Sequence, residues 1–417
     1  MSPVIGVARL LPSRFLSGRQ GNIAQHMTDL PRVYLDNAAT TFPKPEAVYE
    51  ATDFYARELG TAFGRGNYAQ ARETQQRIDQ ARTGAASLLS AEDAKQIIFT
   101  FSGTDSLNLV IKGSLSPGDH VVTTAIEHNS VLRPLYELEK KGMIEITCVK
   151  CDSVGMVNPE DIRSAIRRNT NLIAVNHVSN VTGAIQPVCD IGSLARGNEI
   201  PFLVDGAQSV GSFRVSVKDI PCDYLAVPGH KGLLGPLGTG VLYIRPGREV
   251  GLRSLREGGT GLFSGDVRQP DVLPEKYESG NHNVPGLVGL EAAIAFLLKQ
   301  DIGQVRTHED NLADQLREAV AKLPHGTVYG PTESSDRLSI VSINIDGYEP
   351  HELASILDQH YGIQVRAGMH CAARIHAYIG SEPFGGTVRF SCGPFNTQKD
   401  IDWTIKALEE IASAAIR

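Results

Sequence analysis

A lysine next to a histidine stands at the start of a glycine run, in the segment GHKGLLGPLGTGVLY over residues 229–243. Lys231 follows Tyr224–Val227, a short apolar run that is typical of a buried strand. A lysine in that position could form a Schiff base with a carbonyl group. The glycines would also suit a nucleotide-binding loop, but such a loop opens a helix. A second strand pattern, Gly240–Ile244, follows directly, which counts against a dinucleotide-binding loop. Taken alone, a lysine is more often a surface charge than a Schiff-base residue.

An aspartate ends another strand pattern upstream, in PFLVDGAQS over residues 201–209. An aspartate that bonds a pyridinium nitrogen has to sit deep and be fixed on a rigid strand, which suits Asp205. The alternative is a helix cap or a turn, which Gly206 and Gln208 also allow. One strand–turn–strand excursion separates Asp205 from Lys231, so both side chains can reach one ring.

Short apolar runs alternate with helical patterns from Val33 onward. This alternation predicts βαβ units and a mostly parallel sheet of seven strands, so the fold class is α/β. The predicted strands are Ile97–Phe101, Val121–Ile126, Ile144–Val149, Leu172–His177, Phe202–Asp205, Tyr224–Val227 and Gly240–Ile244. The predicted helices between them include Ser106–Lys112, Val131–Lys141, Pro159–Arg167 and Asp190–Gly197.

The polar residues of interest follow these strands rather than precede them. Ligands in open α/β sheets bind beyond the carboxyl ends of the strands, so five strand ends are expected to converge on one site. The residues at those ends are Thr104, His128, Asn180, Asp205, His230 and Lys231.

The pattern changes after Glu257–Gly289, a stretch rich in Gly and Pro that we interpret as loops. We expect an N-terminal extension over 1–30, a large domain over 31–285 and a smaller α+β domain over 286–417. In the smaller domain the predicted helices are Leu290–Leu298, Asn311–Leu323, His351–Tyr361 and Lys399–Ile416, and the predicted strands are Leu338–Ile345, Ile363–Arg366 and Thr387–Phe390.

Composition excludes several classes of protein. The 417 residues carry a net charge of −7, which gives no general attraction to nucleic acid or anionic membranes. No stretch approaches the roughly 18 uninterrupted apolar residues of a membrane span. Six cysteines are too few for a disulfide framework, so we expect a reduced, cytoplasmic location. Cys148 and Cys151 form a lone C-x-x-C without a second pair, and the histidines lack metal-ligand spacing, so no metal is expected.

The first 28 residues contain Arg9, Arg14 and Arg19 and no acidic residue. Such a start could be an organelle transit peptide. We favour an extension of no consequence, with translation starting at Met27, because the segment has no clear amphipathic period.

Taken together, these segments resemble the cysteine desulfurases, which belong to the class V aminotransferase group of fold-type I pyridoxal-phosphate enzymes. The short interval between Cys371 and Arg389 is similar to the group II branch, which also contains the selenocysteine lyases. The matching segments are YLDNAATTFPKP (34–45), FSGTDSLNLVIKG (101–113), IEHNSVLRP (126–134), NHVSNVTGAIQP (176–187), VDGAQS (204–209), GHKGLLGPLGTGVLY (229–243), VRAGMHCAARIHAYIG (365–380) and GGTVRFSCGPFNT (385–397).

The resemblance implies a role for each residue around the cofactor ring. Lys231 holds pyridoxal phosphate as a Schiff base and later takes the substrate Cα proton. Asp205 keeps the ring nitrogen protonated, Gln208 bonds the ring hydroxyl, and Asn180 contacts the cofactor or the substrate. His128 stacks on the ring face, whereas a lone histidine taken by itself is more often a helix cap or a core residue.

The phosphate is expected at the start of a helix, where Gly103, the N–H groups and the Thr104 hydroxyl face an anion. His230 resembles the family's phosphate histidine. The chain departs from the family pattern at two positions. Pro228 stands where Ser or Thr is frequent, and Asn281 stands where a threonine reaches the phosphate across a homodimer interface. These departures concern cofactor affinity, and we expect the fold to be unaffected.

Cys371 resembles the family's sulfur nucleophile. Nearby cations lower the pKa of a thiol, and Arg366, His370 and Arg374 are close in sequence. Taken without the resemblance, a free cysteine is more often buried and inert. Met369 replaces a residue that is often His or Leu in the family.

Two further arginines complete the expected site. Arg389 lies in a strand pattern, and a planar guanidinium suits bidentate capture of an α-carboxylate, although a solvated strand-edge arginine is the alternative. Arg366 is expected to help bind the substrate. Arg65, in FGRGNYA, is expected to line the entrance.

These residues lead to the hypothesis of a cysteine desulfurase that converts L-cysteine to L-alanine and a persulfide on Cys371, which then passes sulfur to an acceptor protein. The first alternative is a selenocysteine lyase or another C–S lyase, in which Cys371 is partly or wholly dispensable. The second is a catalytically silent scaffold for sulfur transfer, which has no need to retain Lys231, Asp205, His128 and Cys371 together.

Overall fold

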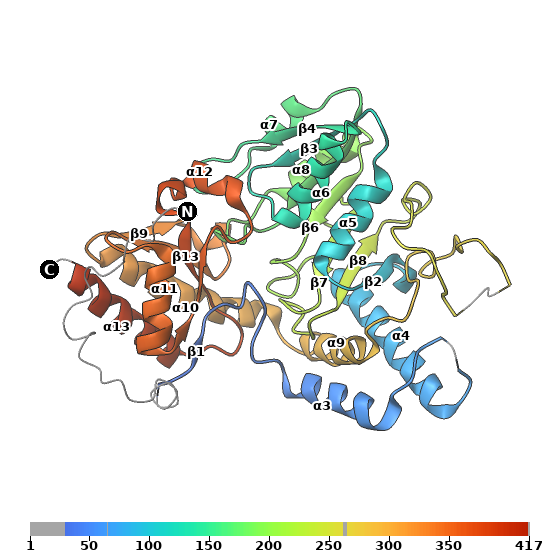
Figure 1. Cartoon of the computed structure of the whole chain (residues 1–417), viewed down its shortest axis with the longest axis horizontal. Coiled ribbons are helices and arrows are strands. Elements are labelled where there is room, and N and C mark those ends of the chain that lie inside the picture. Colours follow the sequence, from blue (N-terminus) through green and yellow to red (C-terminus); the bar gives the residue numbers. More distant parts are fainter. Residues whose placement is uncertain (1–29, 65, 262–264, 416–417) are drawn as a thin grey trace, which may run out of the picture.

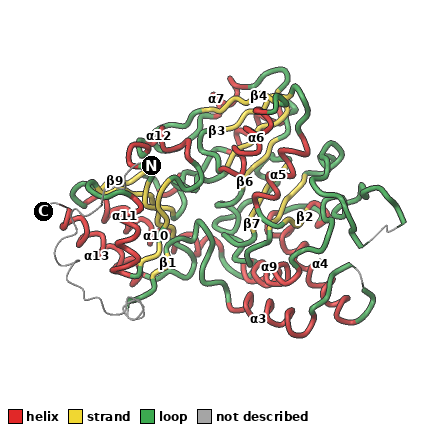
Figure 2. The backbone as a smooth tube through the Cα atoms, viewed as in Figure 1, coloured by secondary structure: helices red, strands yellow, loops and turns green. Residues whose placement is uncertain are grey.

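The computed structural model describes residues 30–64, 66–261 and 265–415 (Figure 1). The prediction for the first 28 residues and the role expected of Arg65 lie outside the described residues. Within the described part, no helix is long and apolar enough to cross a membrane. Two sheets organise the chain, and Figure 2 shows their strands in yellow between the helices.

The larger sheet has seven strands in the order β2-β8-β7-β6-β5-β3-β4. The prediction of a mostly parallel seven-stranded sheet is therefore confirmed. One strand, β8, runs antiparallel to both of its neighbours, β2 and β7. The strands are β2 (Ile97–Thr100), β3 (Asp119–Thr124), β4 (Ile144–Val149), β5 (Thr170–Asn176), β6 (Phe202–Asp205), β7 (Tyr224–Pro228) and β8 (Gly240–Ile244).

Helices cover both faces of this sheet, which explains why its central strands appear in the sequence as unbroken apolar runs. Strands β2, β6, β7 and β8 are buried at every position. One face packs against α5 and α6, and the other against α3, α4, α7, α8 and α9. These helices are α3 (Glu46–Phe54), α4 (Ala69–Leu89), α5 (Gly103–Ser114), α6 (Asn129–Lys140), α7 (Pro159–Ala165), α8 (Val188–Gly197) and α9 (Val284–Leu297).

The structure corrects one loop prediction. The end of Glu257–Gly289 is helical, because α9 begins at Val284. The Asn283 side chain accepts a hydrogen bond from the Gly286 N–H and so caps the helix, and Pro285 lies in its first turn, where proline costs no hydrogen bond.

The smaller sheet has four antiparallel strands in the order β12-β13-β10-β9. The predicted strand Ile363–Arg366 is split: β11 pairs with β1 near the start of the chain, and β12 joins the four-stranded sheet. The elements are β1 (Val33–Tyr34), β9 (Gly326–Tyr329), β10 (Ile340–Ile345), β11 (Ile363–Gln364), β12 (Arg366–Gly368), β13 (Thr387–Ser391), α10 (Ile302–Lys322), α11 (Pro350–Tyr361), α12 (His376–Ile379) and α13 (Gln398–Ala415).

Two segments lie with the sheet that is farther from them in sequence. Val33 and Leu35 pack in the core of the smaller sheet, together with β10, β13 and the helices around them. Helix α9 packs against α3 and α4 beside the larger sheet. We propose that the chain has the two predicted domains, except that residues 33–35 belong to the smaller domain and α9 belongs to the larger one.

Candidate active site

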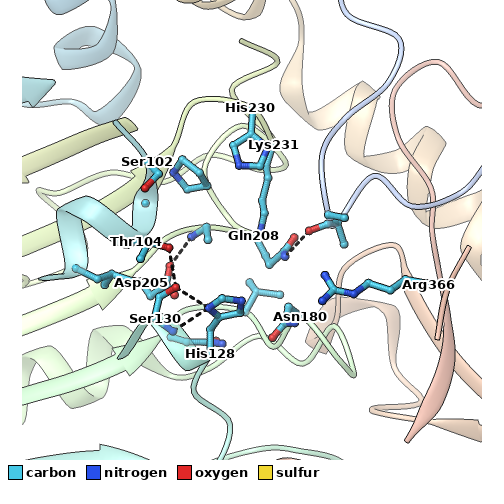
Figure 3. A pocket seen from close by; sticks show the side chains of 18 of the residues that line it. Ser102, Thr104, His128, Ser130, Asn180, Asp205, Gln208, His230, Lys231 and Arg366 are labelled. Carbon is cyan, nitrogen blue, oxygen red and sulfur yellow. Dashed lines mark hydrogen bonds between the residues drawn. The ribbon is translucent and has the colours of Figure 1, made fainter. Parts of the chain in front are cut away.

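A cavity of about 210 Å³ lies at the carboxyl ends of β2, β3, β5, β6 and β7, where the smaller sheet also reaches it (Figure 3). The structure brings ten of the predicted site residues to this cavity. They are Gly103, Thr104, His128, Asn180, Asp205, Gln208, His230, Lys231, Arg366 and Arg389.

Lys231 and Asp205 are both buried in this cavity, and each influences the charge state of the other. Burial lowers the pKa of the Lys231 amine to about 8, although Asp205 acts in the opposite direction. Burial also raises the pKa of Asp205, against the effects of Lys231 and of the Ala207 N–H that donates to Asp205 Oδ1 at 3.0 Å. A lysine with this pKa is partly unprotonated near neutral pH, which is the state that reacts with a carbonyl carbon.

Residues 38–44, which follow β1, bind the two loops that carry Gln208 and Lys231. Gln208 Nε2 donates to the Ala38 carbonyl at 3.0 Å. The His230 carbonyl accepts from the Thr41 N–H at 3.1 Å and from Lys44 Nζ at 2.7 Å. The His230 ring itself faces the cavity, and its buried Nδ1 has no partner among the described residues. Burial, Lys231 and Lys44 lower its pKa to about 4, so the ring is neutral.

Helix α5 opens toward the cavity. The Ser102 side chain caps it by accepting from the Asp105 N–H at 3.1 Å. The first N–H groups of a helix have no partner inside it and suit an anion. Pro228 packs over Gly103, where an added Cβ would lie 3.1 Å from the proline Cδ. The backbone at Gly103 can approach β7 this closely because it carries no side chain.

His128 stands at the start of α6 and is fixed at one ring nitrogen. Its Nδ1 accepts from the Ser130 N–H at 3.0 Å, and Ser130 Oγ lies 2.9 Å from the same nitrogen. Burial, followed by the nearby charge of Lys231, lowers the pKa of His128 to about 4. His128 therefore both caps α6 and lines the cavity.

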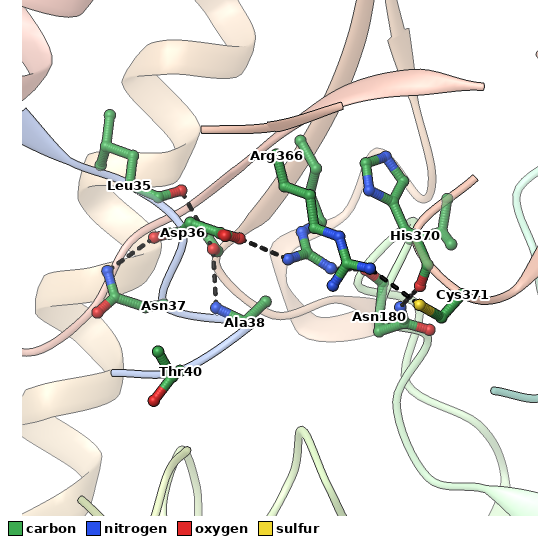
Figure 4. Close-up of polar contacts among 12 residues, drawn as sticks. Leu35, Asp36, Asn37, Ala38, Thr40, Asn180, Arg366, His370 and Cys371 are labelled. Carbon is green, nitrogen blue, oxygen red and sulfur yellow. Dashed lines mark hydrogen bonds and ion pairs between the residues drawn. The ribbon is translucent and has the colours of Figure 1, made fainter. Parts of the chain in front are cut away.

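Two arginines come from neighbouring strands of the smaller sheet. Arg366 on β12 and Arg389 on β13 are direct partners in the antiparallel register. Arg389 is fully buried, pairs with Asp36 at 2.6 Å and donates to the Asn180 carbonyl at 3.0 Å (Figure 4). Its buried Nε has no partner among the described residues. Like charges directly opposite each other repel, so each arginine needs a compensating acceptor.

Cys371 supplies that acceptor for Arg366, whose guanidinium donates to Sγ at 2.9 Å (Figure 4). The cysteine is half-buried, at φ 60°, and follows His370 at φ 49°. Two hydrogen bonds hold this strained turn: Asn180 Nδ2 donates to the His370 carbonyl and the Asn129 N–H to the Cys371 carbonyl, each at 2.7 Å. The thiol is therefore presented beside the cavity, without being one of its lining residues.

Asn281 does not line this cavity. It lines a separate cavity of about 540 Å³, beside His282 and Glu278. Within one chain, the structure therefore does not place Asn281 with the residues that are expected to hold the phosphate.

Three contributing residues were not predicted: Asp36, Ser130 and Glu127. Glu127 is fully buried, and its Oε1 accepts from the Thr124 hydroxyl at 2.7 Å and the Asn176 N–H at 3.0 Å, so it joins the ends of β3 and β5. Burial raises its pKa to about 8, so it carries a proton at neutral pH. All three lie within segments that match the family, and Glu127 and Ser130 are one and two positions from His128.

Comparison with known proteins agrees with this geometry. A family model described as aminotransferase class V matches residues 33–403. A protein named probable cysteine desulfurase from Methanothermobacter thermautotrophicus is 36% identical over 383 residues, which cover 91% of this chain and 94% of that protein. A cysteine desulfurase from Yersinia pseudotuberculosis is 30% identical over 396 residues, which cover 93% of this chain and 95% of that protein.

Solved structures give the same result. A cysteine desulfurase from Thermococcus onnurineus superimposes with a TM-score of 0.86 at 32% identity, over 93% of this chain and 98% of that chain. A cysteine desulfurase from Escherichia coli superimposes with a TM-score of 0.82 at 30% identity, over 95% of this chain and 99% of that chain.

Proposed function

Since this chain belongs to the class V aminotransferase family and to the cysteine desulfurases within it, we propose that its cavity removes sulfur from L-cysteine. The products are L-alanine and a persulfide on Cys371, which passes the sulfur to an acceptor protein. The observation that supports this best is the position of the Cys371 thiol, held by Arg366 beside a cavity that contains Lys231 and Asp205.

The residues of the cavity fit pyridoxal phosphate. A buried amine suits an aldehyde, and a buried carboxylate suits a protonated ring nitrogen; Lys231 and Asp205 provide these groups. The first turn of α5 and the His230 ring, whose Nδ1 is buried without a partner, suit the phosphate. When bound, the cofactor supplies an electron sink for the carbanion at the substrate Cα.

The protein positions the substrate through Arg389. A guanidinium has five N–H donors, and the Asp36 and Asn180 contacts use only two of them. Arg389 lines the cavity, and its remaining N–H groups are those that we assign to the α-carboxylate of L-cysteine. Arg366 adds a second positive charge on the neighbouring strand, which favours an anionic substrate.

Lys231 and Cys371 carry out the proton and sulfur transfers. The unprotonated Lys231 Nζ takes the proton from the substrate Cα. The Cys371 thiolate, paired with the Arg366 guanidinium, bonds to the substrate sulfur while the Cβ–S bond breaks. The electron pair of that bond stays on the alanine carbons, one proton completes the methyl group, and Lys231 returns the proton to Cα. The atoms balance without any external reductant.

The proposal is tested by the visible absorption of the purified protein before and after addition of L-cysteine. We expect a yellow absorbance that changes with L-cysteine, together with formation of alanine and, when a thiol reductant is present, sulfide. L-selenocysteine and cysteine conjugates are measured in parallel. A colourless protein that does not bind pyridoxal phosphate, or turnover confined to the conjugates, would contradict the proposal.

A second prediction concerns Arg389. Arg389→Lys keeps a positive charge beside Asp36 but loses the planar fork that binds a carboxylate. We expect KM for L-cysteine to rise by about tenfold, with a smaller change in kcat, because the carboxylate loses one charge-assisted hydrogen bond. The matched control is Arg245→Lys, which changes a pair with Asp223 outside the cavity and is expected to leave KM unchanged. Steady-state kinetics that show no difference between the two variants would remove Arg389 from the substrate site.

A further inference from the structure

Three polar groups form a continuous chain from the start of α5 to the His128 ring (Figure 3). Thr104 Oγ1 lies 2.8 Å from Ser130 Oγ, and Ser130 Oγ lies 2.9 Å from His128 Nδ1. The Ser130 N–H donates to the same Nδ1 at 3.0 Å. His128 thus receives two contacts on one nitrogen, both from Ser130.

The amide of Ser130 determines where the hydrogen of the His128 ring lies. A backbone N–H can donate and cannot accept, so Nδ1 has to present a lone pair and carries no hydrogen. A neutral imidazole has one N–H group, which is therefore at Nε2. The charged groups that face the ring are Lys231, Arg366, Arg133 and Arg389, and together with burial they keep it neutral.

The position of this hydrogen also determines which hydroxyl donates in each contact between Thr104, Ser130 and His128. Because Nδ1 carries no hydrogen, the Ser130 hydroxyl is the donor in its contact with the ring. A serine hydroxyl has one hydrogen, so the Thr104 hydroxyl donates to Ser130 Oγ. Thr104 then has its backbone N–H, and no hydroxyl hydrogen, to offer to an anion at the start of α5.

We propose that Ser130 is a positioning residue that fixes His128 as a neutral ring with its one hydrogen on Nε2. No described residue makes a hydrogen bond with Nε2, and His128 lines the cavity. The ring is thus a fixed donor toward the bound molecule, whose identity rests on the proposed function. His128 can take a proton only at Nδ1, and only after that nitrogen loses both contacts with Ser130.

The test uses the purified full-length holoenzyme with ring-¹⁵N-labelled histidine, and a His128→Asn variant assigns the resonances. In the unsubstituted protein we expect Nδ1 to resonate as an unprotonated acceptor and Nε2 as a protonated nitrogen. Ser130→Ala removes the hydroxyl and keeps the backbone N–H, so Nδ1 loses one of its two hydrogen-bond donors. These donors stabilise the ring only while Nδ1 carries no hydrogen. We expect it to raise the pKa of His128 by about half to one pH unit. Ser130→Thr keeps the hydroxyl and is expected to restore the original value.

Three results would overturn the proposal: a hydrogen on Nδ1 in the unsubstituted protein, no change in Ser130→Ala, or an equal change in Ser130→Thr. The first measurement needs no substitution of Ser130, so it decides the matter even if Ser130→Ala does not fold. Because the readout is the state of the resting ring and not turnover, failure of this proposal is distinguishable from failure of the proposed desulfurase activity.

Discussion

Cys371→Ser is expected to lower the rate of alanine formation from L-cysteine by about three orders of magnitude or more. A hydroxyl at this position is a poor nucleophile toward sulfur, whereas the Cys371 sulfur accepts a hydrogen bond from Arg366 that holds it beside the cavity. The visible absorbance change on adding L-cysteine is expected to remain, because the residues that line the cavity are untouched. Alanine, sulfide and the mass of the peptide that contains position 371 are measured in the unsubstituted protein and in the variant.

The matched control is Cys189→Ser, which removes an exposed thiol on α8, away from the cavity. We expect it to retain full activity, and the mass of one added sulfur to appear on Cys371 alone. Sulfide release that continues undiminished in Cys371→Ser would contradict the nucleophile assignment and favour a C–S lyase that needs no protein thiol.

Lys231→Ala is expected to abolish turnover and to remove the covalently held cofactor. The variant loses both the amine that captures an aldehyde and the base that takes the Cα proton. The absorbance of the purified variant and its alanine formation are measured with and without a small primary amine such as ethylamine. Partial recovery with the added amine is expected, since the cavity left by the side chain can admit it.

A second lysine makes this test discriminating. Burial also lowers the pKa of Lys44 to about 8. Its Nζ donates a hydrogen bond to the carbonyl of His230, the residue that precedes Lys231. Lys44→Met is expected to retain the yellow absorbance that Lys231→Ala loses. The opposite result would show that Lys44 is the residue that binds the cofactor.

The lowered pKa of Lys231 also predicts how cofactor uptake depends on pH. Only the unprotonated amine attacks an aldehyde, so a pKa lowered from 10.5 to about 8 increases the reactive fraction at neutral pH. The rate at which the cofactor-free protein takes up pyridoxal phosphate should rise with pH and level off above about 8. Stopped-flow absorbance measures this rate, and a rise that continues to pH 10 would mean that Lys231 keeps an ordinary pKa.

The strands of the larger sheet were predicted to within two residues at each end, because both of its faces are covered and each strand contains a run of apolar residues. Helix α4 was not predicted. Its buried stripe includes Thr74 and Arg82, and Arg82 is buried only because it pairs with Glu278 at 2.6 Å. A polar residue in such a stripe hides the apolar period, and its distant partner cannot be identified from local sequence.

At the site, too, partners that are distant in sequence could not be predicted. Cofactor residues follow strands, so their convergence could be predicted from strand ends. The Asp36–Arg389 pair joins residues 353 positions apart and depends on how β1, β11 and β13 come together, which no local pattern specifies. His128 caps α6 through the backbone N–H of Ser130, and histidine is not among the residues that mark an N-cap, so no local pattern indicated the role of Ser130.

The opposite strands that bear Arg366 and Arg389, together with the turn that bears Cys371, have a consequence for how such an enzyme could change over time. All three groups belong to the smaller sheet, whereas Lys231, Asp205 and His128 belong to the larger one. Substitutions in β12, β13 and the segment between them can therefore alter which amino acid is accepted, or where its side-chain group goes, while Lys231 and Asp205 stay unchanged. Such substitutions have to preserve the hydrogen bonds of Asn129 and Asn180 to that segment and to Arg389, because these bonds connect the two sheets at the site.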